Sequence, residues 1–236
     1  TRRESVSMPV RIAAAEGDLG ASTSLLEELE HLAQRRRLPR AAASARLERA
    51  RSLMNRGHLD AARKQIDLAD DPAVWQAARR LRLRANDVEY PALARIRLAL
   101  HEDRAPAALA DLRRELAEAA GSGRLRRALA LRFLEGAARH FAGDVEGASA
   151  VLDLALSDAA REGAVRLVLD EGAPLATAIR AAAQRGVPRA QRRDPHVRAW
   201  LKDLLAAMPH AGCGEPSGDA LSAPLEALTA KEMQVL

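Results

Sequence analysis

Hydrophobic residues recur along this chain at the three- and four-residue spacing of a helix face, and short polar turns interrupt them. One such stretch carries Leu47, Ala50, Leu53 and Met54, and it ends just before Gly57. Apolar positions at this spacing are typical of amphipathic helices. Similar stretches follow one another along the chain, so the pattern predicts helices joined by short turns.

One turn phrase occurs four times. It opens with Gly or Asp, reaches a small residue five positions later, and has an aliphatic residue four positions after that. The phrases begin at Gly17, Gly57, Asp103 and Gly143, so 40, 46 and 40 residues separate their starts. Self-similarity at such a period is typical of proteins built by stacking one supersecondary unit.

Each phrase predicts a pair of antiparallel helices. Glycine suits the left-handed residue that ends a helix, and a small residue after the turn lets the second helix approach the first closely. The small residues are Ser22, Ala62, Ala108 and Ala148, and the aliphatic residues that follow them are Leu26, Ile66, Leu112 and Leu152. On the preceding helices, Ala50 and Gly136 are the small residues expected where the paired helices cross.

The repeated unit resembles the tetratricopeptide repeat, in which small residues and a central glycine have these roles. It departs from the usual period of about 34 residues, and most of the usual Trp and Tyr are absent. Asp70, Asp71 and Pro72 predict a stop after the second unit, and residues 73–87 predict an inserted helix carrying Trp75. Stacked pairs bury their faces only against neighbours. We therefore expect an all-α fold, a superhelical array of antiparallel helix pairs of the tetratricopeptide-like α-solenoid kind.

Four further phrases resemble the large LuxR-family regulators of the MalT type, in the same order. Residues 89–99 look like the "EYLTLAR-hydrophobic-Leu-x-Ala" phrase of their central repeat. Residues 166–175 are similar to their "RxFxDEGxPL" phrase, with Val168 in place of phenylalanine, and residues 199–205 look like the helix that follows. Residues 228–236 look like the opening of a LuxR-type helix-turn-helix.

Thr229 and Glu232 have the spacing of a capping box at the start of a helix. With Lys231 they mark the expected start of a DNA-binding domain, and we expect that domain to be truncated in this chain. The resulting domain organisation is a helical repeat domain over 1–209, a flexible linker over 210–224, and the truncated helix-turn-helix start over 225–236.

The resemblance implies a sensor and signal-transfer domain of a bacterial transcription regulator. Its expected partners are a small-molecule inducer or a regulatory protein, the neighbouring ATPase and helix-turn-helix domains, and DNA only through the missing C-terminal domain. The resemblance implies that the intact protein binds ATP. We expect no cofactor in this fragment. The alternative is a passive tetratricopeptide-like scaffold that binds proteins and senses nothing. A completed helix-turn-helix after Leu236 would favour the first, and another repeat the second.

The composition indicates which structural and cellular classes of protein this chain fits. Apolar residues make up 48% of the 236 and aromatic residues only 2%, which favours helices over strands. No run approaches the roughly 20 apolar residues of a membrane span, the first residues form no signal peptide, and Cys213 is the single cysteine. We expect a cytoplasmic protein without membrane contact.

The net charge is 37 − 32 = +5, which raises the question of nucleic-acid binding. Only Lys64, Lys202 and Lys231 are lysines, so 37 − 3 = 34 cations are arginines. An alanine- and arginine-rich composition indicates a GC-rich coding bias more than a DNA-binding surface, because the basic clusters are dispersed.

Candidate catalytic groups are not found. No lysine follows a glycine, as a phosphate-binding loop would require, and the six histidines have neither metal-ligand spacing nor a cysteine cluster. The adjacent carboxylates of Asp70–Asp71 and Asp170–Glu171 are expected to be helix caps. The sequence therefore predicts no enzyme and no metal site.

A binding surface remains, which such arrays place on their concave face. Alignment of the units on their turns puts Arg11, Arg51 and Arg97 at equivalent positions. If that position faces the groove, it could hold an anionic ligand or an acidic peptide; the alternative is coincidence in an arginine-rich chain. Tyr90, Phe133 and Trp75 could stack on a ligand, or they could pack in the core.

Overall fold

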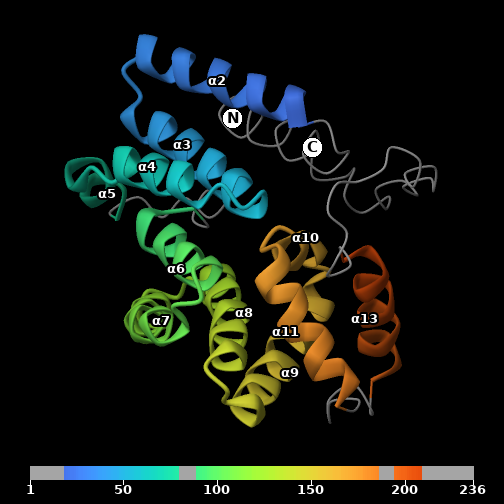
Figure 1. Cartoon of the computed structure of the whole chain (residues 1–236). Coiled ribbons are helices and arrows are strands. Elements are labelled where there is room, and N and C mark those ends of the chain that lie inside the picture. Colours follow the sequence, from blue (N-terminus) through green and yellow to red (C-terminus); the bar gives the residue numbers. More distant parts are fainter. Residues whose placement is uncertain (1–18, 80–88, 186–193, 209–236) are drawn as a thin grey trace.

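The computed structural model of this chain describes residues 19–79, 89–185 and 194–208, and every regular element within these ranges is a helix. The helices are α2 (Leu19–Arg35), α3 (Pro39–Asn55), α4 (Leu59–Ala69), α5 (Pro72–Arg79), α6 (Pro91–His101), α7 (Ala105–Gly121), α8 (Leu125–Phe141), α9 (Val145–Glu162), α10 (Val165–Leu169), α11 (Ala173–Gln184) and α13 (Pro195–Ala207). Successive helices pack side by side as a curved array (Figure 1). The expected all-α array is confirmed.

The turn phrases form the predicted helix ends. Gly57 and Gly143 have φ angles of 78° and 83°, and Asp103 takes the same left-handed conformation with φ 56°. After Gly57, the amide of His58 donates to the carbonyl of Leu53 at 2.9 Å. This bond spans five residues and is the mark of the Schellman motif, which satisfies the last carbonyls of a helix. The first phrase begins at Gly17, outside the described residues.

The same turn also joins one pair to the next, which the repeat phrases did not predict. Arg37, Gly123 and Gly163 are left-handed as well, with φ angles of 52°, 67° and 63°. The left-handed positions 103, 123, 143 and 163 therefore lie 20 residues apart, as do 37 and 57. One turn of fixed geometry thus closes each of these helices, within pairs and between pairs.

Small and aliphatic residues fill the crossings as predicted. Ala62, Ala108 and Ala148 are at most 1% exposed, and so are Ile66, Leu112 and Leu152. At Gly136 of α8, an added Cβ would lie 2.5 Å from the Cδ2 and Cγ atoms of Leu152 in α9. The glycine therefore creates the space that the leucine occupies.

The array is interrupted between α4 and α6. These two helices have 11 residues each, whereas α3 and α7 have 17. The Asp71 carboxylate accepts from the amide of Ala73 at 2.9 Å and so caps α5, as expected for this acidic pair. Trp75 of α5 donates its indole N–H to the Ala69 carbonyl at 2.8 Å. The rest of the helix expected over 73–87 lies outside the described residues.

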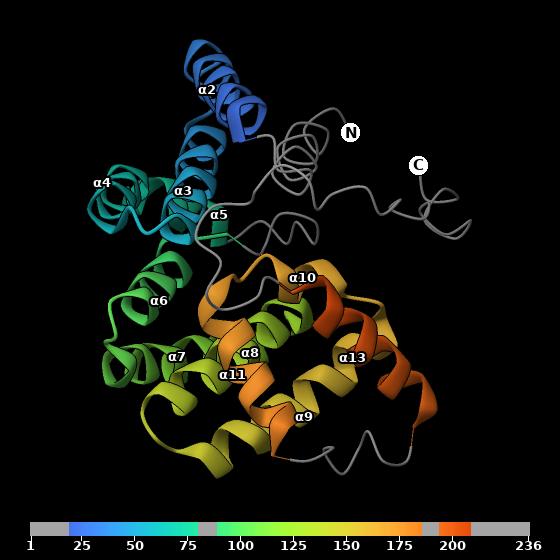
Figure 2. The same cartoon turned by 45° about the vertical axis from the view of Figure 1, so that its right-hand side comes forward.

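The last helices fold back along the array. In Figures 1 and 2, α11 and α13 lie beside α8 and α9, and α10 lies near the end of α3. Helix α13 contains the phrase 199–205 and buries Val197, Trp200, Leu201 and Leu204. The main core runs from α6 through α13. Positions 210–236, including the expected linker and Thr229, Lys231 and Glu232, lie outside the described residues.

Candidate functional site

A cluster of buried charges lies where the turn between α10 and α11 meets α3 and α6. We call Asp170, Glu171 and Gly172 the 170–172 turn. Its two carboxylates meet arginines from the two helices, and two glutamates complete the group. The central charge cluster consists of Glu48, Arg51, Glu89, Arg97, Asp170 and Glu171.

Arg97 of α6 is the most buried cation of the cluster. Its Nε and Nη2 atoms donate to Oε2 and Oε1 of Glu171, each at 2.7 Å, and Nη1 donates to Glu89 at 2.7 Å. The side chains of Arg97 and Glu171 are 5% and 1% exposed. A guanidinium that donates two parallel bonds to one carboxylate fixes both position and orientation, so this contact sets how α6 and the 170–172 turn lie against each other.

Arg51 of α3 makes the second half of the cluster. It donates to the Glu48 carboxylate at 2.7 Å from Nη2, and from Nη1 to the backbone carbonyl of Asp170 at 2.9 Å. The Asp170 carboxylate lies 3.8 Å from the same guanidinium. The 170–172 turn is therefore held from two helices at once.

Burial and charge shift the acidities in opposite directions here. Burial raises the pKa of Glu89, and the Glu48 charge raises it further, although Arg97 works against both. Burial disfavours the charge of Arg97, but Glu171 and Glu89 outweigh it and raise its pKa. Burial lowers the pKa of His101, at the end of α6. The arginines thus stay charged, and Glu89 takes up a proton more readily than an exposed glutamate.

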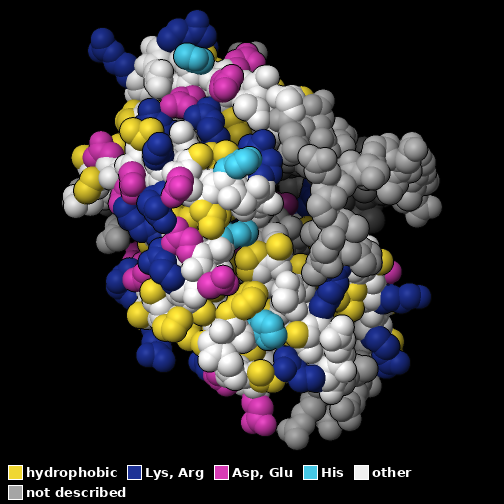
Figure 3. Space-filling view, in the orientation of Figure 1, with side chains coloured by type: hydrophobic (Ala, Val, Ile, Leu, Met, Phe, Trp, Pro, Cys, Tyr) yellow, Lys and Arg dark blue, Asp and Glu magenta, His cyan; other side chains and the backbone are white. Residues whose placement is uncertain are grey.

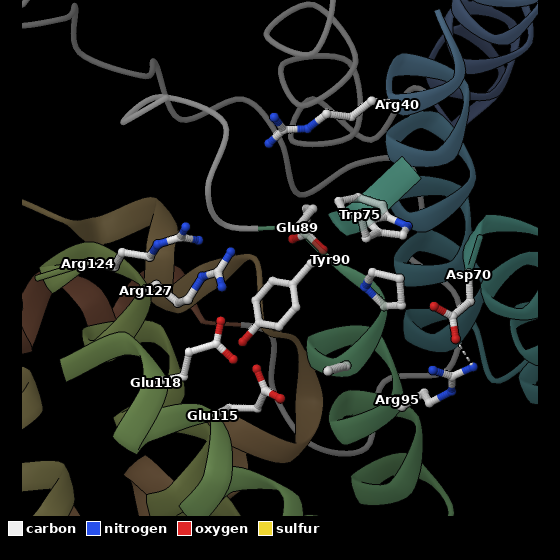
Figure 4. Close-up of a pocket in the computed structure, with 12 residues that line it drawn as sticks. Arg40, Asp70, Trp75, Glu89, Tyr90, Arg95, Glu115, Glu118, Arg124 and Arg127 are labelled. Atoms are coloured by element: carbon white, nitrogen blue, oxygen red, sulfur yellow. Dashed lines mark ion pairs between the residues drawn. The ribbon is translucent and has the colours of Figure 1, made fainter. Parts of the chain in front are cut away.

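A pocket of about 150 Å³ adjoins the cluster at the interruption of the array. Trp75, Tyr90, Pro91 and Ala92 supply its apolar wall, and charged residues from α3, α7 and α8 surround them (Figure 4). Glu89 lines this pocket and also accepts from Arg97. The pocket and the central charge cluster therefore share one side chain.

Tyr90 is held in the pocket wall by two neighbours. The guanidinium carbon of Arg127 lies 3.9 Å from the centre of the tyrosine ring, within the range of a cation–π contact. Burial, with the nearby Glu115 carboxylate, raises the pKa of the Tyr90 hydroxyl. The tyrosine is thus neutral, and its side chain lines the pocket.

The structure brings some of the predicted site residues together and separates others. Arg51 and Arg97 meet in one cluster, where both donate to carboxylates of the same chain. A role for them in ligand binding stays a prediction. Phe133 is 0% exposed in the core, so it cannot stack on a ligand without repacking. Tyr90 lines the pocket. Arg11 lies outside the described residues.

Sequence reasoning missed the acidic partners. Asp170 and Glu171 were expected to be helix caps, yet they pair with Arg51 and Arg97, because the chain folds back over a distance that no local pattern reveals. Glu89 and Glu171 each lay in a phrase that resembled a known family. The presence of these two glutamates within family-like phrases was the sequence signal that could have indicated a structural role for them.

The outer surface mixes charges of both signs. On the face in Figure 3, cationic and anionic side chains intermingle over α4 and α6. Glu102 pairs with both Arg63 and Arg104, and Asp70 pairs with Arg95 at 2.5 Å. In these pairs, three arginines lie beside carboxylates of the same chain.

The described residues offer neither a metal site nor a membrane span. They contain no group of three or more side chains able to hold a metal ion. They also contain no helix that is long and apolar enough to cross a bilayer.

Comparison with known proteins agrees with the fold and with the phrases at the cluster. The family model for the MalT-like TPR region matches residues 4–185, from before α2 to just after α11, and so includes the whole central charge cluster. No curated protein and no solved structure matches the chain. Since the match covers most of its length, this chain belongs to the MalT-like TPR family.

Proposed function

We propose that this chain is the sensor and signal-transfer region of a cytoplasmic transcription regulator of the LuxR family. The observation that carries the proposal is the shared residue Glu89, which lines the pocket and bonds to Arg97. A ligand or partner group that contacts Glu89 competes with that bond. Occupancy of the pocket would then alter the hold of α6 on the 170–172 turn.

The pocket lining suggests the class of ligand. Arg40, Arg95, Arg124 and Arg127 face four acidic residues, Asp70, Glu89, Glu115 and Glu118, around an apolar wall. An equal number of charges of each sign favours an uncharged or zwitterionic molecule over an anion. The apolar wall of Trp75 and Tyr90 suits a flat or ring-bearing face.

The remaining roles belong to the intact regulator. We infer from the family resemblance that ATP binds a neighbouring module, and that DNA is bound by a domain after Leu236. We also propose that the repeat region itself catalyses no reaction and needs no cofactor.

The first test is the thermal stability of the protein against a library of metabolites. A ligand present at about 100 times its dissociation constant stabilises the native state by roughly 2.7 kcal/mol, which is a clear shift in Tm. A saturable shift supports the sensor function. Trp75→Phe and Glu118→Gln should then weaken binding of the ligand, because both residues line the pocket.

Glu146→Gln is the matched control for Glu118→Gln. Glu146 is an exposed glutamate of α9 that does not line the pocket. Equal binding by both variants would place the ligand elsewhere and overturn the assignment of the pocket.

The second candidate function is a passive protein-binding scaffold. The equal number of positive and negative residues around the pocket also fits a purely structural role, in which these residues pair with one another and no ligand binds. Under this function no metabolite shifts Tm, and a bound protein partner is recovered whose affinity is unchanged by Glu118→Gln.

A further inference from the structure

The contact between α3 and the 170–172 turn is unusual for an array of stacked helix pairs. In such arrays each unit touches only its neighbours. Here Arg51 donates to the carbonyl of Asp170, a residue 119 positions later, and Arg97 reaches Glu171 across 74 positions. The curved array therefore closes on itself at this point, as Figures 1 and 2 show.

The chemistry of this closure favours two discrete states over gradual loosening. A buried ion pair contributes little more stability than well-packed apolar residues would, but a buried charge that has lost its partner is strongly destabilising. The side chains of Arg97 and Glu171 are at most 5% exposed when paired. They are thus stable either fully joined or fully separated into water.

The backbone of the turn is adapted to this contact. Gly172 has φ 79° and ψ −159°, a combination that is essentially restricted to glycine. An added Cβ would lie 2.3 Å from the side-chain oxygen of Asn55, at the end of α3. Glycine at this position therefore lets the turn lie directly against α3.

The turn is also connected to the last helix of the described chain. Helix α10 packs on α8 and α13, and α11, which begins at the turn, packs on α8 and α9. Movement of the turn away from α3 would thus carry α10 and α11 and change the position of α13.

We propose that the 170–172 turn is a latch that closes the array and that its opening moves α13 relative to α4. The latch consists of the two arginine contacts to the turn and the packing of Gly172 against α3. It is a conformational device held by contacts within the chain, so its test needs no added ligand.

The test measures the distance between α4 and α13 by pulsed electron spin resonance. Lys64→Cys and Lys202→Cys place spin labels on exposed positions of these helices, and Cys213→Ser removes the native thiol. In this background we compare Glu171→Gln, which removes a latch charge at constant shape, with Asp158→Asn. Asp158 pairs with Arg132 on the surface between α8 and α9 at 3.5 Å, so it loses an inter-helix charge outside the latch.

The closed latch predicts one narrow distance distribution in the starting protein. Glu171→Gln should add a second population at longer distance, and Asp158→Asn should not. An unchanged distribution in Glu171→Gln, with native helical content by circular dichroism, would overturn the proposal.

A second measurement covers the case in which Glu171→Gln does not fold. In the labelled starting protein, urea below the main unfolding transition should lengthen the α4–α13 distance before helical content falls. If distance and helical content change together, the contact belongs to the cooperative core and there is no latch.

Discussion

The helix pairs and the latch solve the same problem, the joining of two helices, by opposite means. At the crossings within pairs, small residues meet aliphatic side chains, as Gly136 meets Leu152. At the latch, charged groups are drawn out of water to meet across 74 and 119 positions of the chain. The first kind of contact is local and tolerates gradual change, whereas the second depends on every partner being present.

Complete removal of one latch carboxylate should have the largest effect on stability. Glu171→Ala leaves the buried guanidinium of Arg97 without its bidentate partner. We expect the free energy of unfolding to fall by about 3–5 kcal/mol, the usual cost of breaking a buried pair. Urea denaturation followed by circular dichroism measures it.

Asp158→Ala is the surface control, since its pair with Arg132 is nearly half exposed on both sides. Exposed pairs contribute about 0–1 kcal/mol. If the two variants lose similar stability, the latch is no more than another surface contact.

A smaller effect is expected where an apolar crossing is overfilled. Gly136→Ala adds a methyl group 2.5 Å from Leu152, which is 1% exposed and has no free space to enter. Overpacking of this kind costs about 1–3 kcal/mol, measured as a change in unfolding free energy.

Gly121→Ala separates the steric effect from helix propensity. Gly121 ends α7, and an added Cβ there meets nothing within 4 Å. Alanine should stabilise this position by up to about 1 kcal/mol. If both alanine variants changed the unfolding free energy with the same sign, the α8–α9 crossing would have room for the added methyl group.

Substitutions at the left-handed turns should change stability by smaller amounts, with opposite signs at Gly57 and Asp103. Gly57→Ala should cost about 1–2 kcal/mol, because φ is 78° and alanine is strained there although no atom lies near. Asp103→Gly should stabilise by less than about 1 kcal/mol, because φ is 56° at a residue with a side chain. Thermal melts of both variants test the common turn. Opposite signs confirm it, and equal losses contradict it.

The smallest effect concerns pH. Burial disfavours the charge of Glu30, but hydrogen bonds from Arg46 and Arg49 outweigh it and lower its pKa. The folded pKa is therefore below the unfolded value of about 4.3. The contribution of Glu30 is present above pH of about 4.3 and is lost as pH falls through the folded pKa.

Glu30→Gln should consequently flatten the fall of Tm between neutral and acidic pH, and Glu27→Gln, at an exposed position of the same helix, should not. An equal flattening by Glu27→Gln would mean that general charge repulsion controls the acid limb.

Local chemistry was readable from the sequence. The turn at Gly57, the small residue Ala62 and the aliphatic residue Ile66 all follow from which residues a tight helix pair permits, and the structure places them as expected. The turns at Arg37 and Gly123 were missed because the first has no glycine and neither belongs to the repeated phrase.

The latch and the pocket were not readable in the same way. No periodicity connects Arg97 with Glu171, and the pairing exists only because the array curves back. Arg51 and Arg97 were picked out for a shared position in the repeat, but their roles are set by acidic residues from other parts of the chain. Glu89 could not be assigned to a pocket wall before the interruption between α4 and α6 was placed.

The 20-residue spacing of the left-handed turns limits how this chain can be lengthened or shortened. Each helix reverses the direction of the one before it. Gain or loss of a single helix would therefore invert everything downstream, whereas duplication of a pair would keep the directions. Duplication of a helix pair between Arg51 and Asp170 would nevertheless separate these two residues and break their hydrogen bond. The number of helix pairs between Arg51 and Asp170 is therefore fixed by the contact between these two residues.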